Sequence, residues 1–139
     1  MGWLFYSFVS AGAAAATAIL AKVGVEGVPS NLATAIRTIV ITAFAWTIVA
    51  ATGEHRAMAG MSRRSLTFLV LSGVATGVSW LAYFRALQLA PASRVSPIDK
   101  LSLPLTIVAA ALFLGESVGW RLGIGVGLMT VGAILTIGG

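Results

Sequence analysis

The chain has 139 residues, of which 58% are hydrophobic and 9% are charged, and its mean hydropathy is +0.99. A water-soluble domain of this size does not need so much apolar surface, so the composition excludes the soluble enzyme classes and indicates an integral membrane protein. The nine Lys and Arg residues, which give a net charge of +5, are dispersed toward the expected helix ends, so binding to nucleic acid is not expected.

Five apolar stretches follow one another along the chain, each close to the roughly 20 residues that cross a bilayer as a helix. They predict an all-α membrane protein with spans at about 3–21, 32–51, 65–89, 95–114 and 119–137. Pro29-Ser30-Asn31 is a helix-start signal before the second span. The whole chain, 1–139, is therefore expected to form one transmembrane domain.

An odd number of spans places the two termini on opposite sides of the membrane. The side of the amino terminus has four arginines, and the other side has two to four basic residues, depending on whether those inside the span ends are counted: Arg56, Arg63, Arg64 and Arg121 against Lys22 and Arg94, with Arg85 and Lys100. The positive-inside rule counts Lys and Arg near span ends. This small excess favours a cytoplasmic amino terminus and leaves insertion in both orientations open.

Small residues recur at every fourth position in two spans: Gly73 and Gly77 in the third, and Gly119, Gly123 and Gly127 in the fifth. Helices in lipid approach one another closely where such residues meet. The two glycine stripes indicate either packing within one chain or contact between two copies of the chain.

Charged residues inside the expected spans are costly in hydrocarbon and mark candidate functional positions. Arg37 lies about two turns into the second span, and Asp99 and Lys100 lie about one turn into the fourth. At a rise of about 1.5 Å per residue, Arg37 and Asp99 lie at a similar depth, which makes an ion pair between them plausible. Arg85 and Lys100 are also long enough to reach the interface from helix ends.

Pro104 cannot donate a hydrogen bond to the carbonyl of Lys100, so we predict a helix hinge there. Trp80, Tyr83 and Phe84, deep in the third span, either line a cavity or face lipid. The candidate substrate or coupling residues are thus Arg37, Asp99, Lys100, Arg85, Trp80 and Tyr83. With no cysteine and one histidine, no catalytic residue, metal ligand or cofactor is expected.

Several short motifs, in this order, resemble the EamA domain of the drug/metabolite transporter superfamily: Tyr83-Phe84-Arg85-Ala86-Leu87, Ala90-Pro91-Ala92-Ser93-Arg94-Val95, Leu103-Pro104, Leu114-Gly115-Glu116 and the glycine-rich stretch 123–132. The resemblance covers nearly the whole chain, which looks like a single-domain, half-size member of a family in which many members carry two such domains. It implies transport by alternating access through a cavity lined by the third and fourth helices, and it fixes no substrate.

Two five-span units joined end to end are inverted relative to each other, and two separate chains can reproduce this by inserting in opposite orientations. We therefore expect a ten-helix antiparallel homodimer that acts as a secondary transporter of a small polar metabolite, anionic or zwitterionic, with Asp99 as the group best placed to carry a proton. The expected location is the cell membrane, the inner one in a Gram-negative source. The alternatives are a membrane scaffold or accessory subunit without transport, and half of a heterodimeric flippase for a lipid-linked substrate.

Overall fold

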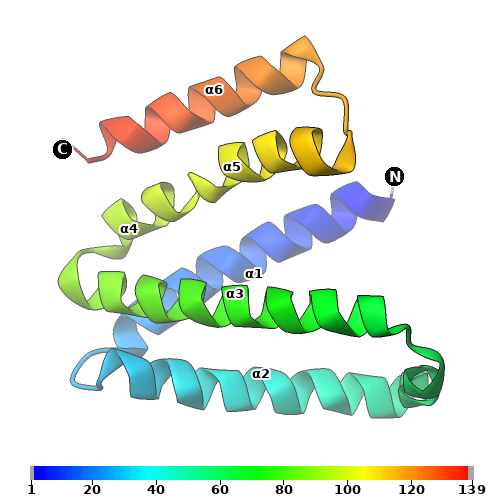
Figure 1. Cartoon of the computed structure of the whole chain (residues 1–139). Coiled ribbons are helices and arrows are strands. Elements are labelled where there is room, and N and C mark those ends of the chain that lie inside the picture. The colour runs from blue at the N-terminus through cyan, green and yellow to red at the C-terminus, as the bar shows by residue number, and fades with distance from the viewer. Residues whose placement is uncertain (1, 138–139) are drawn as a thin grey trace. The chain divides into compact units, whose positions relative to one another are not determined.

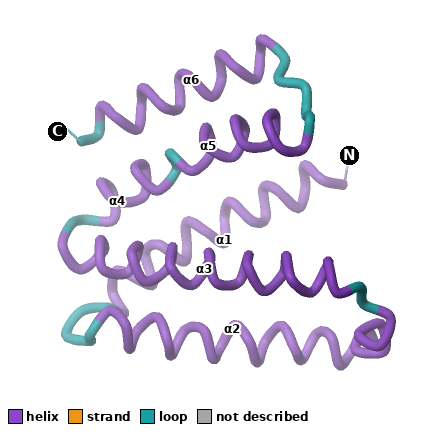
Figure 2. The backbone as a smooth tube through the Cα atoms, in the orientation of Figure 1, coloured by secondary structure: helices purple, strands orange, loops and turns teal. Residues whose placement is uncertain are grey.

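The computed structural model describes residues 2–137, and every regular element in that range is helical (Figures 1 and 2). The elements are α1 (Gly2–Gly24), α2 (Ser30–Thr52), the 3₁₀ helix η1 (Glu54–Gly60), α3 (Arg63–Leu89), α4 (Ala92–Asp99), α5 (Ser102–Ala109), the π-helical turn η2 (Ala110–Leu114) and α6 (Trp120–Leu135). They form two compact units, each described here by itself: unit 1 comprises Met1–Ile19 and Ala90–Gly139, and unit 2 comprises Leu20–Leu89.

Four helical segments are long and apolar enough to cross a membrane. They are α1, α2, α3 and the segment Ala92–Leu114, which contains α4, α5 and η2. The last helix, α6, is also apolar but has only 16 residues, or about 24 Å of helix against about 30 Å of hydrocarbon. The chain is thus an all-helical, multi-pass membrane protein whose fifth apolar helix is shorter than the expected span 119–137.

In unit 2, α2 and α3 lie side by side as an antiparallel pair joined through η1 (Figure 1). Helix α2 begins at Ser30, directly after Pro29, and ends where Gly53 takes a left-handed conformation with φ 74°. Glycine tolerates this conformation without strain. At the start of α3, the Ser65 backbone N–H donates to Ser62 Oγ at 3.0 Å, an N-terminal cap that satisfies one unpaired backbone donor.

The core of unit 2 lies at the end where α1, the 25–29 turn and α3 meet. Leu87 is fully buried, and Phe84 and Val25 are each 3% exposed. Two side chains tie these segments together: Lys22 Nζ donates to the Leu87 carbonyl at 2.6 Å, and Gln88 Nε2 donates to the Val28 carbonyl at 2.7 Å. A backbone oxygen near the end of α3 and one in the turn between α1 and α2 thus accept hydrogen bonds from side chains of neighbouring segments.

In unit 1, α4 and α5 pack on α6, and Val95 and Ala133 are buried. The expected fourth span, 95–114, was predicted as one helix with a hinge. The structure instead shows two helices that are separated at Lys100 and Leu101, visible as a short loop in Figure 2. The segment also begins earlier, at Ala92.

Two prolines explain the interruption. Pro97 lies inside α4 and Pro104 lies in the first turn of α5, and neither has an N–H to donate to the preceding turn. The Lys100 carbonyl accepts the Leu103 N–H at 3.0 Å instead, and the Lys100 N–H is shared between the carbonyls of Ser96 and Pro97 at 3.3 and 3.2 Å. Hydrogen bonds to the third preceding residue therefore occur on both sides of the break, as in a 3₁₀ helix.

We expect Leu87→Ala to lower the free energy of unfolding by about 2 kcal/mol, because the fully buried side chain leaves a cavity. The matched control is Leu89→Ala, since Leu89 is 70% exposed and its loss should change stability by less than about 0.5 kcal/mol. Reversible unfolding in mixed micelles with increasing dodecyl sulfate measures both. Equal effects of the two substitutions would contradict the packing described for unit 2.

Candidate functional site

Arg37 meets aromatic rings of α3 inside unit 2. It lies seven residues after Ser30, or about 10 Å into α2, whereas Trp80 and Phe84 lie about 13 and 8 Å before the end of the antiparallel α3. The guanidinium Cζ is 4.3 Å from the centre of the Trp80 ring and 5.4 Å from the centre of the Phe84 ring. Both distances are within cation–π range.

Tyr83 completes this group, which we call the Arg37 cluster (Arg37, Trp80, Tyr83 and Phe84). The rings of Tyr83 and Phe84 meet edge to face with centroids 6.5 Å apart, and Tyr83 lies within electrostatic range of the guanidinium. Positions three and four residues apart share one face of a helix, so the three aromatic residues lie on one face of α3, and Trp80 and Phe84 contact α2 through Arg37.

The side-chain hydroxyl groups nearest to Arg37 along α2 donate hydrogen bonds to carbonyls of the same helix. Thr34 Oγ1 donates to the Ser30 carbonyl at 2.9 Å, and Thr38 Oγ1 donates to the Thr34 carbonyl at 2.8 Å. Within the described part of unit 2, no oxygen accepts a hydrogen bond from the Arg37 guanidinium. The aromatic faces hold the cation, and the N–H groups at its edge stay available.

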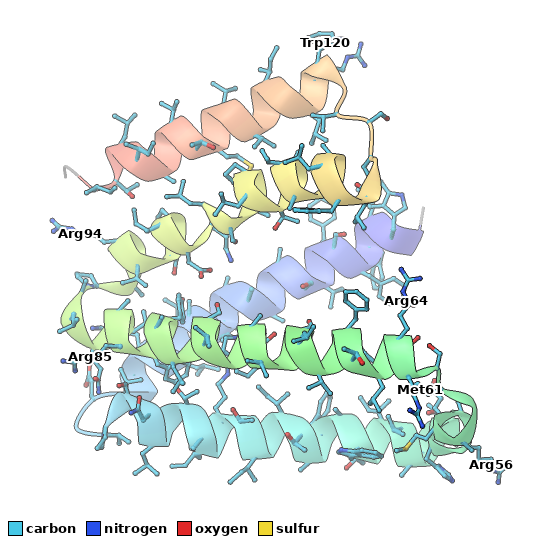
Figure 3. The ribbon with its side chains drawn as sticks, in the orientation of Figure 1. Arg56, Met61, Arg64, Arg85, Arg94 and Trp120 are labelled. Carbon is cyan, nitrogen blue, oxygen red and sulfur yellow. The ribbon has the colours of Figure 1, made fainter. Side chains whose placement is uncertain are left out.

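Arg85, another candidate residue, is an exposed residue near the end of α3 (Figure 3). Its Nη1 donates to Gln88 Oε1 at 3.1 Å, and Gln88 in turn donates to the Val28 carbonyl. This is the geometry of a long basic side chain that reaches outward from a helix end.

The second candidate group lies at the break between α4 and α5 in unit 1. Lys100 Nζ is 3.3 Å from Asp99 Oδ2, with the side chains 54% and 37% exposed, respectively. Adjacent residues do not face each other in a regular helix, so the pair depends on the interruption that begins at Lys100. Pro104 lies one turn further on, at the start of α5.

The expected ion pair between Arg37 and Asp99 stays a prediction, because the two residues belong to different units. Inside its own unit, each has another partner: the rings of Trp80 and Phe84 for Arg37, and Lys100 for Asp99. From the sequence, Phe84 is placed with Trp80 and Tyr83 in the third span but is not included among the candidate site residues, although its spacing of four residues from Trp80 indicates a shared helix face.

The two glycine stripes are open within their own units. A Cβ atom added at any of the five positions would meet no heavy atom of the described part of its unit within 4 Å, and these positions are Gly73, Gly77, Gly119, Gly123 and Gly127. Neighbouring helices of the same unit therefore do not use these glycines for close approach.

A double-mutant cycle tests the contact between Arg37 and Trp80. We expect Arg37→Met and Trp80→Leu to couple by about 0.5–2 kcal/mol in the free energy of unfolding, the range of a cation–π contact. The control cycle pairs Arg37→Met with Trp46→Leu, because Trp46 lies about 13 Å further along α2 and is exposed. A coupling energy no larger than in the control cycle would show that the cation–π contact is absent.

Comparison with known proteins identifies the family. The model of the EamA-like transporter family matches residues 1–138. A relative from a Sinorhizobium species, described as an uncharacterized transporter in the cobO 3'region, is 48% identical over 133 residues, which cover 96% of this chain and 94% of the relative. No solved structure matches the chain. Taken with the apolar helices and the charged groups within them, the match shows that this chain belongs to the EamA-like transporter family.

Proposed function

We propose that the protein is a secondary transporter that moves a small polar metabolite across the cell membrane by alternating access, as an inverted pair of chains. The observation that carries this proposal is the broken segment Ala92–Leu114 with the Asp99–Lys100 pair at the break. In transporters, interrupted helices near the middle of the membrane expose backbone groups and charges where substrates and coupling ions bind.

A helix break in an apolar segment is tolerated in a membrane only where it is buried in protein or lines a water-filled cavity, because irregular backbone is costly in hydrocarbon. At this break the carbonyls of Pro97, Ile98 and Lys100 keep backbone donors, so the charged Asp99–Lys100 pair is the group that most needs such surroundings. An ion pair that is about half exposed needs water or protein around it for the same reason. The break between α4 and α5 thus supports an aqueous path along this segment.

Asp99 is the proposed coupling residue. It is the one carboxylate that the sequence places inside an apolar span, since the other acidic residues, Glu26, Glu54 and Glu116, lie between the long helices. When Asp99 takes up a proton, its attraction for Lys100 is lost. Proton binding and the state of the Asp99–Lys100 pair are therefore linked, and a conformational change that favours one of the two states couples proton and solute movement.

Three features support the inverted pair. If α6 crosses the membrane as a short span, the chain has five spans and an odd topology. Most large apolar side chains of the described residues are exposed, and both glycine stripes are open within their units. Faces with glycine at every fourth residue permit close helix contacts in lipid. The matched relative has a similar length, because 94% of it aligns with this chain, which fits assembly from single-domain chains.

Proton movement in proteoliposomes tests the function. A pH-sensitive dye inside the vesicles reports proton flux when small metabolites are added in groups by charge. We expect at least one solute to drive proton movement, Asp99→Asn to abolish it because the residue can no longer bind a proton, and Asp99→Glu to retain part of it. Glu116→Gln, outside the spans, is the matched control.

Unchanged proton movement in Asp99→Asn would remove the coupling role. A well-assembled protein that moves none of the solutes would favour a scaffold or accessory subunit. Transport that requires a second, different chain and a lipid-linked solute would favour the heterodimeric flippase.

A further inference from the structure

The guanidinium of Arg37 is held in place but not neutralised within its unit. Trp80 and Phe84 position it at 4.3 and 5.4 Å from their ring centres, and no oxygen in the described part of unit 2 accepts its hydrogen bonds. An arginine side chain carries five N–H donors in a fixed plane. The contacts with the rings involve the positive charge centred on Cζ and use none of these donors as hydrogen bonds to oxygen, so the donors remain for an acceptor from outside unit 2.

The two aromatic contacts offset part of the cost of this charge. Together they contribute about 1–4 kcal/mol, against a cost for an arginine at the centre of a membrane span that runs from about 2.5 to more than 10 kcal/mol. Water or an anionic group that accepts hydrogen bonds from the guanidinium lowers this cost further. An anion with two oxygens fits best, because the guanidinium fork binds carboxylate or phosphate through two parallel hydrogen bonds.

The surrounding charges favour an anion over a cation. Lys22 and Arg85 lie at the same end of unit 2 as Arg37, and Arg85 Nη1 donates to the neutral Gln88 Oε1, which does not cancel the charge of Arg85. Glu26, the nearest acidic residue along the chain, is exposed in the turn between α1 and α2. An organic cation would meet like charges here.

We propose that Arg37, positioned by Trp80 and Phe84, is the receptor for the carboxylate or phosphate group of the transported solute. This inference rests on the proposed function, because it assumes a small polar solute, and it assigns the residue that binds the anionic group of that solute. It assigns Arg37 to the solute and Asp99 to the coupled proton. Trp80 and Phe84 are positioning residues that hold the guanidinium plane in a fixed orientation.

Tryptophan fluorescence tests this directly, since Trp80 lies against the guanidinium. Replacing Trp3, Trp46 and Trp120 by Phe leaves Trp80 as the only tryptophan. The purified protein in a neutral detergent is titrated with succinate and with inorganic phosphate, and with the uncharged succinamide as the matched probe, at constant ionic strength. We expect a saturable change in emission with one of the anions at half-saturation between about 1 µM and 1 mM, the usual range for small metabolites, and none with succinamide.

Two substitutions of Arg37 distinguish the effect of its positive charge from the effect of its hydrogen-bond geometry. Arg37→Met should abolish the response, and Arg37→Lys should weaken binding at least about ten-fold, because an ammonium group cannot form the two parallel hydrogen bonds. The matched control is Arg64→Met: Arg64 also lies over an aromatic ring, that of Phe68, at 6.0 Å, but at the start of α3. This variant should keep the wild-type response.

Three outcomes would overturn the inference: an equal response to succinamide, an unchanged response in Arg37→Met, or no saturable response to either anion. A response only to vesicles of phosphatidylglycerol, absent with phosphatidylcholine, would also overturn it, because the arginine would then bind a lipid headgroup and not a solute. Anion binding without proton-coupled flux in proteoliposomes would sustain this inference and contradict the proposed function. Proton-coupled flux of a cation without anion binding would contradict this inference and support the proposed function.

Discussion

A charged side chain inside a membrane span needs an interaction partner from the protein, because hydrocarbon provides none. The contact of Arg37 with Trp80 and Phe84 meets part of this requirement, and it also fixes how α2 and α3 align along their length. The hydrogen bonds from Lys22 to Leu87 and from Gln88 to Val28 hold the same end of unit 2. The position of the proposed anion receptor therefore follows from the packing of this hairpin.

The same requirement applies to the backbone in unit 1. Pro97 and Pro104 remove two backbone hydrogen-bond donors from one span, and the helix is interrupted between them at Lys100 and Leu101. Asp99 and Lys100 form an ion pair at this interruption. Each unit thus has a charged feature within an apolar segment, a cation held on aromatic rings in unit 2 and an ion pair in unit 1. In the proposed mechanism these serve the solute and the proton, which is the division of roles that a coupled transporter needs.

The sequence predicts the helices well and the contacts poorly, for physical reasons. Span lengths are set by bilayer thickness, and Pro29 and Gly53 mark the ends of α2. Pro104 alone indicated a hinge, and the full break became evident only with Pro97 and the observed hydrogen bonds. The apolar sequence of residues 110–114 contains no feature that predicts the π-helical turn Ala110–Leu114. The depth of Arg37 could be counted along its helix, but its aromatic partners depend on which faces of α2 and α3 meet.

The measurement that tests the inverted pair most directly is the orientation of the chain in intact cells. The protein has no cysteine, so one can be placed at Ala59, exposed in η1, which leaves the Ser62 cap of α3 in place. Ser93→Cys reports the opposite side of the membrane. We predict that an impermeant thiol reagent labels about half of each variant from outside. Labelling of nearly all of one variant and almost none of the other would show a single orientation and contradict an inverted pair of identical chains.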